Sequence, residues 1–440
     1  MRAFCAMVMV IVLASPCCAQ QIQAGYAKED ITPTEPTRLG GYSLRTGLSE
    51  GVHEGDRLFV RALAFSDGAT SVLFVESDLI GAHGNSAFRE KVAAATGIPI
   101  DHILCGDVHN HAAPAPKPNG TSAFDQRYGE SLVAAARQAV KNLQPVRIAA
   151  GEGRSRVAMN RRQVRTADVE SVLTFDENHV SQSFGKEKTD TPAKLKEFGG
   201  VVRLGANPTG PIDDAVQLVR IDDMAGKPIA VMIHYACHGT SLGGRNSKVS
   251  AEWMGRMQAH AEKQIPGLGA IFVQGAAGDI NPRVVGGLDG HNDDIHATWA
   301  LGDEIGAEVV RVYRQLNPQP IKARIELVTK EIELPRTYRE LSQDFRNTVV
   351  RAPTTVVRIG PLMWVTFPGE LFSAIGKQVK AACPAPYAHL MGYTNGSIGY
   401  FPTQQAFSQG GYEPATSHLD PTAESVYMRE IAAIMKDFAN

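Results

Sequence analysis

The chain has 440 residues, of which 20% are charged, and its formal net charge is −2 at pH 7. This balance of charge, without a long basic run, argues against nucleic acids and anionic membrane surfaces as binding partners. The cysteines beyond the N-terminal segment are Cys105, Cys237 and Cys383, which allow at most one disulfide bond and exclude a disulfide-rich scaffold.

The first 19 residues predict a secretory signal peptide. Arg2 precedes an apolar run from Ala6 to Ala14, and the small residues that follow predict cleavage after Ala19. Lipidation at Cys17 or Cys18 is an alternative, although the leucine expected upstream is missing. No later segment approaches the roughly 20 apolar residues of a transmembrane helix. We therefore expect a secreted or periplasmic protein with no transmembrane span.

Strand-like and helical patterns alternate along the rest of the chain. The first pair of strands flanks Asp67-Gly68, which predicts a β-hairpin. The expected elements, in chain order, are strands at Leu58–Phe65 and Ser71–Val75, a helix at Ser86–Ala95, a strand at Ile103–Gly106, a helix at Glu130–Leu143, paired strands at Val216–Ile221 and Pro228–Ile233, a helix at Ala251–Lys263, a strand at Ala270–Val273, a helix at Trp299–Leu316, an extended stretch at Ile321–Leu334, a strand at Met363–Val365 that leads to a helix near Glu370, and a helix at Glu424–Phe438.

This alternation predicts the fold class. Strands interspersed with helices indicate an α/β layered domain. Hairpins indicate that the sheet is mixed and not purely parallel. We therefore expect a layered domain with a mixed β-sheet flanked by helices.

Polar clusters follow several of these strands, where ligand sites assemble in open α/β folds. His109 and His111 follow the strand at Ile103–Gly106. Residues two apart in an extended backbone point to the same side, so these imidazoles could form a zinc-binding pair. The alternative is a pair of surface histidines. His238 lies in the motif His-Gly-Thr-Ser after the apolar strand Ile229–Ile233, and by itself it is better explained as a hydrogen-bonded core histidine.

Three further clusters lie later in the chain. Gly275 and Asp279 belong to a small-residue loop that could approach a ligand closely or could simply form a turn. Glu370 follows a buried strand and is either a zinc ligand or an acid at a helix start. Tyr400 and Tyr412 lie in a glycine-rich segment and either line a site or pack as ordinary aromatic residues.

Several large enzyme classes are disfavoured by the motifs that the sequence lacks. It contains no His-Glu-x-x-His helix, no Gly-x-Ser-x-Gly elbow, no P-loop and no convincing dinucleotide-binding glycine motif. Each of the clusters described above is a weak signal alone, so their order along the chain carries the functional information.

Taken in order, the clusters resemble the neutral/alkaline non-lysosomal ceramidase family. The resemblance runs from about Ala24 to Tyr412 and includes the opening segment Gly25–Pro33, the segment around Asp78 and the triplet Met159-Asn160-Arg161. It covers the catalytic domain only, so we expect residues 20–440 to form a single catalytic domain without the C-terminal immunoglobulin-like domain of larger members.

The resemblance implies a bound zinc ion and assigns roles to ten residues. The implied zinc ligands are His109, His238, Glu370 and Tyr400, the implied catalytic residues are His111, Arg161 and Tyr412, and the implied substrate contacts are Asn160, Gly275 and Asp279. One departure is that a serine important in the family is replaced here by Gly275.

The implied function is that of an exported zinc hydrolase that cleaves the amide bond of a small or lipid-like acyl substrate through a metal-activated water. Two alternatives are a zinc-dependent deacylase or esterase that acts on acylated sugars or other acyl groups, and a zinc-containing binding protein without activity. The sequence gives no indication of the oligomeric state.

Overall fold

A computed structural model describes residues 20–43, 45–82, 86–117, 119–165, 201–285, 294–337 and 348–438. The expected signal peptide, residues 1–19, lies outside this part of the chain. Strand β1 (Gln20–Gln21) begins at the residue after the expected cleavage point and pairs with β14 (Lys322–Ala323). No helix among the described residues is long and apolar enough to cross a membrane.

The larger of two principal sheets is mixed. Its strand order over the described residues is β11-β10-β9-β6-β2-β3-β4-β5, with β13 paired to β6. The pairs β4–β5 and β10–β11 are parallel, and the other pairs are antiparallel. The strands are β2 (Gln23–Asp30), β3 (Phe59–Ser66), β4 (Ser71–Ser77), β5 (Ile103–Asp107), β6 (Gln144–Arg154), β9 (Ala215–Asp223), β10 (Pro228–Tyr235), β11 (Gly269–Gln274) and β13 (Gln319–Pro320).

A smaller sheet packs against one face of the larger one. Its order is β15-β16-β17-β19. One buried cluster joins the two sheets and includes Phe74 and Ile271 from the larger sheet and Val357 and Trp364 from the smaller one. The strands are β15 (Ile325–Pro335), β16 (Val349–Ile359), β17 (Leu362–Thr366) and β19 (Tyr387–Met391).

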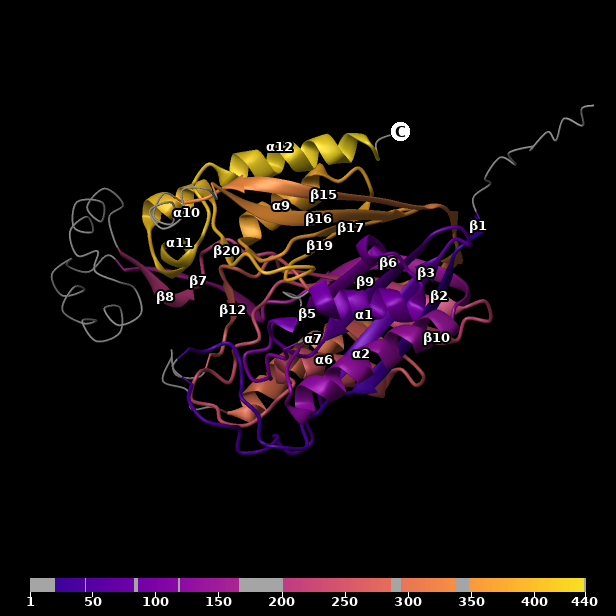
Figure 1. Cartoon of the computed structure of the whole chain (residues 1–440), viewed down its shortest axis with the longest axis horizontal. Coiled ribbons are helices and arrows are strands. Elements are labelled where there is room, and N and C mark those ends of the chain that lie inside the picture. Colours follow the sequence, from indigo (N-terminus) through magenta and orange to yellow (C-terminus); the bar gives the residue numbers. More distant parts are fainter. Residues whose placement is uncertain are drawn as a thin grey trace, which may run out of the picture.

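Helices cover the outer faces of both sheets (Figure 1). The cluster that contains Phe88 and Leu132 joins α1 and α2 to β2–β5, and the cluster that contains Met257 and Val309 joins α6 and α7 to β9–β11. Apolar residues such as Ile431 pack α12 and α9 on the smaller sheet. These helices are α1 (Ser86–Thr96), α2 (Ala123–Lys141), α6 (Glu252–Gln264), α7 (Ile295–Gln315), α9 (Ser373–Ala382) and α12 (Ala423–Lys436).

The predicted α/β class, with a mixed sheet flanked by helices, is confirmed. The hairpin at Asp67-Gly68 is also present, with Gly68 at φ 86° in the turn between β3 and β4. The helix expected near Glu370 begins instead at Ser373, and Glu370 lies in the short strand β18 (Glu370–Leu371). Helix α2 begins at Ala123, well before the predicted Glu130.

The edge strands β5 and β11 stand at opposite ends of the strand order yet contact each other. Gln274, at the end of β11, joins the loops beyond them, because its Nε2 donates to the carbonyl oxygens of Val108 at 3.0 Å and Cys237 at 2.8 Å. Asn110 and Gly239 form a parallel bridge between the same loops. The loops that follow β5, β10 and β11 therefore meet at one place.

Several smaller elements complete the end of the molecule at which the loops after β5, β10 and β11 meet. A three-stranded sheet in the order β12-β7-β8 lies beside the short helices α10 and α11 (Figure 1). The elements are β7 (Ala158–Arg165), β8 (Val201–Asn207), β12 (Ile280–Pro282), β20 (Tyr400–Phe401), α10 (Gln404–Gln409) and α11 (Tyr412–Thr416).

Candidate active site

His109 lies in a tight turn after β5. Its φ is 58°, in the left-handed region, and its N–H donates to Asp107 Oδ1 at 3.0 Å. The backbone here is therefore not extended, and the extended geometry expected for His109 and His111 is wrong. The two imidazole rings are nevertheless 4.8 Å apart, because the turn directs both toward the same place.

His238 is held by its backbone and by one side of its ring. Nδ1 faces the carbonyl oxygens of Ala277 at 2.7 Å and Ile280 at 2.9 Å, so this nitrogen carries the proton. Trp253 Nε1 donates to the His238 carbonyl at 2.8 Å. The unprotonated Nε2 consequently faces the cluster.

Glu370 lies between the two imidazoles. Its Oε2 is 3.1 Å from His238 Nε2 and 3.6 Å from His109 Nε2. The ring of His238 is 4.9 Å from that of His109 and 5.6 Å from that of His111. The structure thus brings three histidines and one carboxylate together from three distant parts of the chain.

The donor set of this cluster fits a metal ion. The lone pair of His238 Nε2 faces a carboxylate oxygen at 3.1 Å, and a cation held between these two electron-rich atoms would satisfy both. Ligands of a tetrahedral ion with bonds of about 2.0–2.1 Å lie roughly 3.3 Å apart, which matches the distances from Glu370 to the imidazoles. Each of His109, His111 and His238 can also offer a ring nitrogen, and these atoms all lie within 4.8 Å of one another.

Burial keeps the histidines of the cluster neutral. It lowers the pKa of His109, His111 and His238 well below the usual range, and the positive charge of Arg161 lowers those of His111 and His238 further. Glu370 opposes the shift at His109. Neutral imidazole is the form that binds metal ions.

Arg161, Tyr400 and Tyr412 lie beside the cluster. Arg161 Nη1 is 3.3 Å from His238 Nε2, and its guanidinium group lies over the Tyr400 ring at 5.3 Å. The rings of Tyr400 and Tyr412 are 5.5 Å apart. Burial, followed by the charge of Glu370, raises the pKa of Tyr400 well above its usual range, and burial also raises the pKa of Tyr412.

The three expected substrate contacts lie in a buried network. Asp279 accepts hydrogen bonds from Asn160 Nδ2 at 3.0 Å and from the backbone N–H of Ser373 at 2.7 Å. The N–H of Gly275 donates to the carbonyl of Tyr235 at 3.0 Å. A Cβ atom on Gly275 would lie 2.9 Å from the Ala236 Cβ, so the glycine fits a closely packed position. A direct contact of these residues with substrate stays a prediction.

The sequence analysis did not identify Tyr393 as part of the site. Its ring lies 4.3 Å from that of His109. Asn395 fixes this segment against β5, because its side chain accepts from the N–H of Cys105 at 2.9 Å and donates to the carbonyl of Ile103 at 3.1 Å. The only signal in the sequence is a polar Tyr-Thr-Asn triplet after an apolar strand.

The segment that contains Gly41 packs against His111 and was not identified from the sequence. Gly41, at φ 88°, lies so close to His111 that a Cβ atom would stand 2.5 Å from its Cγ. The neighbouring Tyr42 packs edge-on against His111 at 4.9 Å, and Arg45 Nη1 donates to the His111 carbonyl at 2.7 Å.

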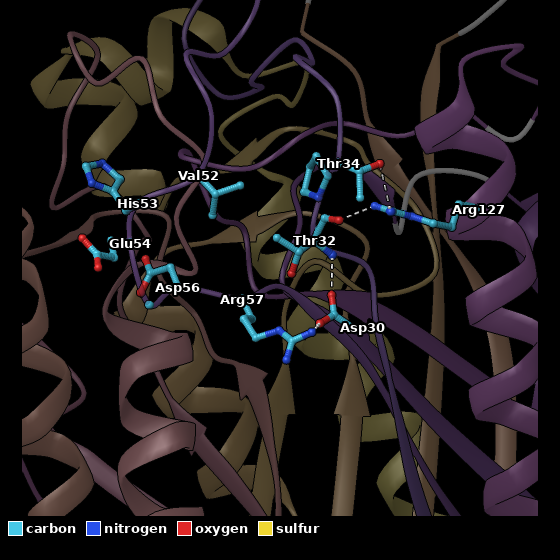
Figure 2. Close-up of a pocket in the computed structure, with 11 residues that line it drawn as sticks. Asp30, Thr32, Thr34, Val52, His53, Glu54, Asp56, Arg57 and Arg127 are labelled. Carbon is cyan, nitrogen blue, oxygen red and sulfur yellow. Dashed lines mark hydrogen bonds and ion pairs between the residues drawn. The ribbon is translucent and has the colours of Figure 1, made fainter.

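A separate surface cavity of about 580 Å³ lies away from these residues (Figure 2). Several of its charged side chains are engaged with neighbours: Arg57 pairs with Asp30, and Arg127 donates to the carbonyl of Thr32. None of the cluster residues lines this cavity. We therefore place the candidate active site at the histidine cluster.

The chain is similar to a known protein family and to solved structures. The family model described as neutral/alkaline non-lysosomal ceramidase, N-terminal, matches residues 22–298. Neutral ceramidase A of Dictyostelium discoideum is 23% identical over 377 residues, which are 75% of this chain and 48% of that protein. Neutral ceramidase B of the same organism is 26% identical over 164 residues, 32% of this chain and 23% of that protein.

Two solved structures share the fold. A ceramidase complexed with C2 has a TM-score of 0.72 at 16% identity, and neutral ceramidase from Pseudomonas aeruginosa has a TM-score of 0.70 at 18% identity. Both alignments cover 95% of this chain and 75% of the other. The chain spans about half the length of Neutral ceramidase A.

Proposed function

Because the chain belongs to the neutral/alkaline non-lysosomal ceramidase family, we propose that it is a zinc-dependent hydrolase of the amide bond in N-acyl, ceramide-like lipids. The observation that supports the proposal is the position of the Glu370 carboxylate between His109 and His238, where the His238 lone pair faces an oxygen atom and a cation would satisfy both. Tyr400, which is paired with Glu370 in strand register, is the fourth proposed ligand.

Zinc bound by these residues would supply a Lewis acid that activates water near neutral pH. The protein holds His238 in the required tautomer through the carbonyl groups of Ala277 and Ile280. Burial keeps the imidazoles unprotonated and ready to coordinate. The chain thus presents a preorganised ligand set.

The remaining polar groups match the needs of amide hydrolysis. Arg161 Nη2 is buried and makes no hydrogen bond of normal geometry with the described residues, so it can donate to the developing oxyanion of the acyl group, while the guanidinium group also interacts with Tyr400. His111 is a neutral imidazole of the cluster that is not among the proposed metal ligands, and it can move a proton to the leaving nitrogen. Tyr412, whose ring lies 5.5 Å from that of Tyr400, offers a protonated hydroxyl.

The test measures metal content and hydrolysis together. His109→Ala and His238→Ala should each lose both bound zinc and turnover of N-acyl sphingosine. His296→Ala is the matched control, because this exposed histidine lies on α7, outside the cluster. Full turnover in a zinc-free variant would refute the proposal.

A substrate panel distinguishes the alternatives. N-acyl sphingosine, acylated sugars and simple esters are compared under the same conditions. Faster turnover of sugars or esters would favour the deacylase alternative. Stoichiometric zinc without turnover of any substrate would favour a binding protein.

We also propose that residues 20–440 form one catalytic domain that is exported after cleavage following Ala19. Expression with the complete N-terminus and mass spectrometry of the exported protein test this point. The expected mature chain begins at Gln20, and retention of residues 1–19 would contradict it.

A further inference from the structure

Glu413 is a buried carboxylate that binds two neighbouring arginines. Its Oε1 accepts from Arg161 Nε at 2.8 Å, and its Oε2 accepts from Arg162 Nη1 at 2.8 Å. The side chain is only 1% exposed. A buried ion pair of this kind requires both partners, because loss of one leaves an uncompensated charge.

The strand that carries both arginines pairs irregularly with its neighbour β8. Arg161 and Arg162 are consecutive residues of β7, and consecutive side chains of a regular strand point to opposite faces. The register between β7 and β8 shifts between Asn160 and Arg162, opposite Gly205 and Ala206. The extra residue of this bulge lies on β8; bulges increase the local twist of the paired strands and are frequent beside active sites.

The two arginines differ in what they do beyond Glu413. Arg161 continues to the cluster, where Nη1 lies 3.3 Å from His238 Nε2 and Nη2 makes no hydrogen bond of normal geometry with the described residues; the guanidinium group also interacts with Tyr400. Arg162 instead donates to the carbonyl of Gly410 at 2.8 Å, away from the histidines. A variant of Arg162 therefore serves as an internal control, because it perturbs the ion pairs of Glu413 without a described contact to the histidines.

The negative charge of Glu413 also keeps Arg161 from pairing with Glu370. Arg161 interacts electrostatically with both carboxylates. If Glu413 were neutral, Glu370 would be the remaining carboxylate close to Arg161, and pairing between them would draw Glu370 away from the imidazoles. Glu413 keeps Arg161 in an orientation in which it can donate to substrate while Glu370 stays free for the metal ion.

We propose that Glu413 is a positioning residue that acts through Arg161, fixing its guanidinium group beside His238 and directing Nη2 to the acyl oxygen. This inference rests on the proposed hydrolase function. It adds a residue with no direct contact to the histidines or to Glu370 among the described interactions, and it assigns that residue a role in turnover.

The kinetic test compares Glu413→Gln with Arg162→Gln. Glu413→Gln should lower kcat by about 10- to 100-fold, the range typical of lost supporting contacts, with KM changed by less than about threefold. Arg162→Gln should keep kcat within about threefold of the wild type. Glu413→Asp should recover part of the lost kcat, because it restores the negative charge. Equal loss of kcat in Glu413→Gln and Arg162→Gln would show that the network only anchors α11, and would overturn the proposal.

A double-mutant cycle tests the path through Arg161. If Glu413 acts through Arg161, the double variant Glu413→Gln/Arg161→Gln should be no slower than Arg161→Gln alone. Multiplicative losses in the double variant would overturn the inference.

A third readout is independent of hydrolysis. The Nε–H of Arg161 is buried and bonded to Glu413, so arginine-selective ¹⁵N NMR should show a slowly exchanging signal that Arg161→Gln removes. Glu413→Gln should shift this signal and accelerate its exchange, while Arg162→Gln should leave it in place. An unchanged signal in Glu413→Gln would overturn the positioning role, whatever the activity of the wild-type protein. Absence of hydrolysis of every substrate by the wild-type protein would instead contradict the proposed function.

Discussion

Glu370 and Tyr400 lie directly opposite each other in the parallel pair β18–β20. Both strands are short, and the backbone N–H of Glu370 also donates to the carbonyl of Gly399 at 2.9 Å. The backbone therefore places a carboxylate and a phenol side by side before any ion binds. This relationship fixes the separation of the backbone positions that carry these two proposed ligands.

Glu370→Gln should abolish stable metal binding. The amide keeps the size of the side chain but removes the negative charge that faces His238 and His109. The loss of metal affinity should exceed the roughly 10- to 100-fold that removal of a supporting contact costs. Metal analysis after dialysis measures it, with Glu331→Gln on the exposed face of β15 as the control. Retention of stoichiometric metal in Glu370→Gln would show that Glu370 is not a ligand.

Gly41→Ala should reduce activity through His111. The new Cβ atom would stand 2.5 Å from His111 Cγ, so the ring must move. Gly47→Ala is a closely matched control, because Gly47 has a φ of 91° against 88° for Gly41 but has open space where its Cβ would be. Both variants carry a similar backbone cost of about 1–2 kcal/mol. Thermal unfolding should show a similar backbone penalty in the two variants, whereas turnover should fall only in Gly41→Ala. Equal activity in the two variants would contradict the close contact between residue 41 and the His111 ring.

Asn395→Ala should destabilise the fold and displace Tyr393. The change leaves the N–H of Cys105 and the carbonyl of Ile103 without their side-chain partner, at a cost of about 1–3 kcal/mol. Asn395 also has a φ of 61°, which alanine tolerates poorly. Asn395→Gly separates the two effects, since it removes the hydrogen bonds but accepts the backbone conformation. Urea unfolding should rank stability as wild type, then Asn395→Gly, then Asn395→Ala.

Glu252→Gln should flatten the dependence of stability on pH. Burial raises the pKa of Glu252 from 4.5 to about 7. Between pH 4.5 and pH 7, Glu252 holds a proton in the folded state that it has released in the unfolded chain. The stability that protonated Glu252 contributes is therefore present below about pH 4.5 and is lost as the pH rises toward 7. The loss is on the order of 3 kcal/mol.

Urea unfolding at pH 5 and pH 8 measures this effect. The free energy of unfolding should fall more steeply with pH in the wild type than in Glu252→Gln, while the other titrating groups are shared and cancel in the comparison. Parallel pH profiles for the two proteins would refute the assigned shift.

Local patterns predicted most of the elements around the larger sheet. The Asp67-Gly68 turn and the helix that begins at Ser86 follow directly from turn chemistry and helical spacing. The second sheet was harder to predict from the sequence. Strand β16 (Val349–Ile359) was missed, because it contains a proline and two adjacent threonines that weaken its apolar pattern. How two sheets stack depends on tertiary packing, which no local pattern contains.

The residues of the candidate site were predicted from motif order, while the arrangement that supports them was not. His109, His238 and Glu370 do lie together, but the extended backbone invoked for the first histidine is a left-handed turn held by Asp107. Tyr393 and Glu413 were missed because each reaches the site through contacts made after the chain has folded. A buried carboxylate between two arginines has no signature in the linear sequence.

The loops after β5 and β10 meet Glu370 only when residues from distant parts of the chain have folded together. The region matched by the family model ends at residue 298, so it includes both proposed histidine ligands but neither Glu370 nor Tyr400. During synthesis, an emerging chain can therefore offer a cation the imidazoles long before it can offer the carboxylate. Under the proposed function, tight capture of the ion should then be one of the last events of maturation, and metal uptake would indicate that the C-terminal sheet has docked.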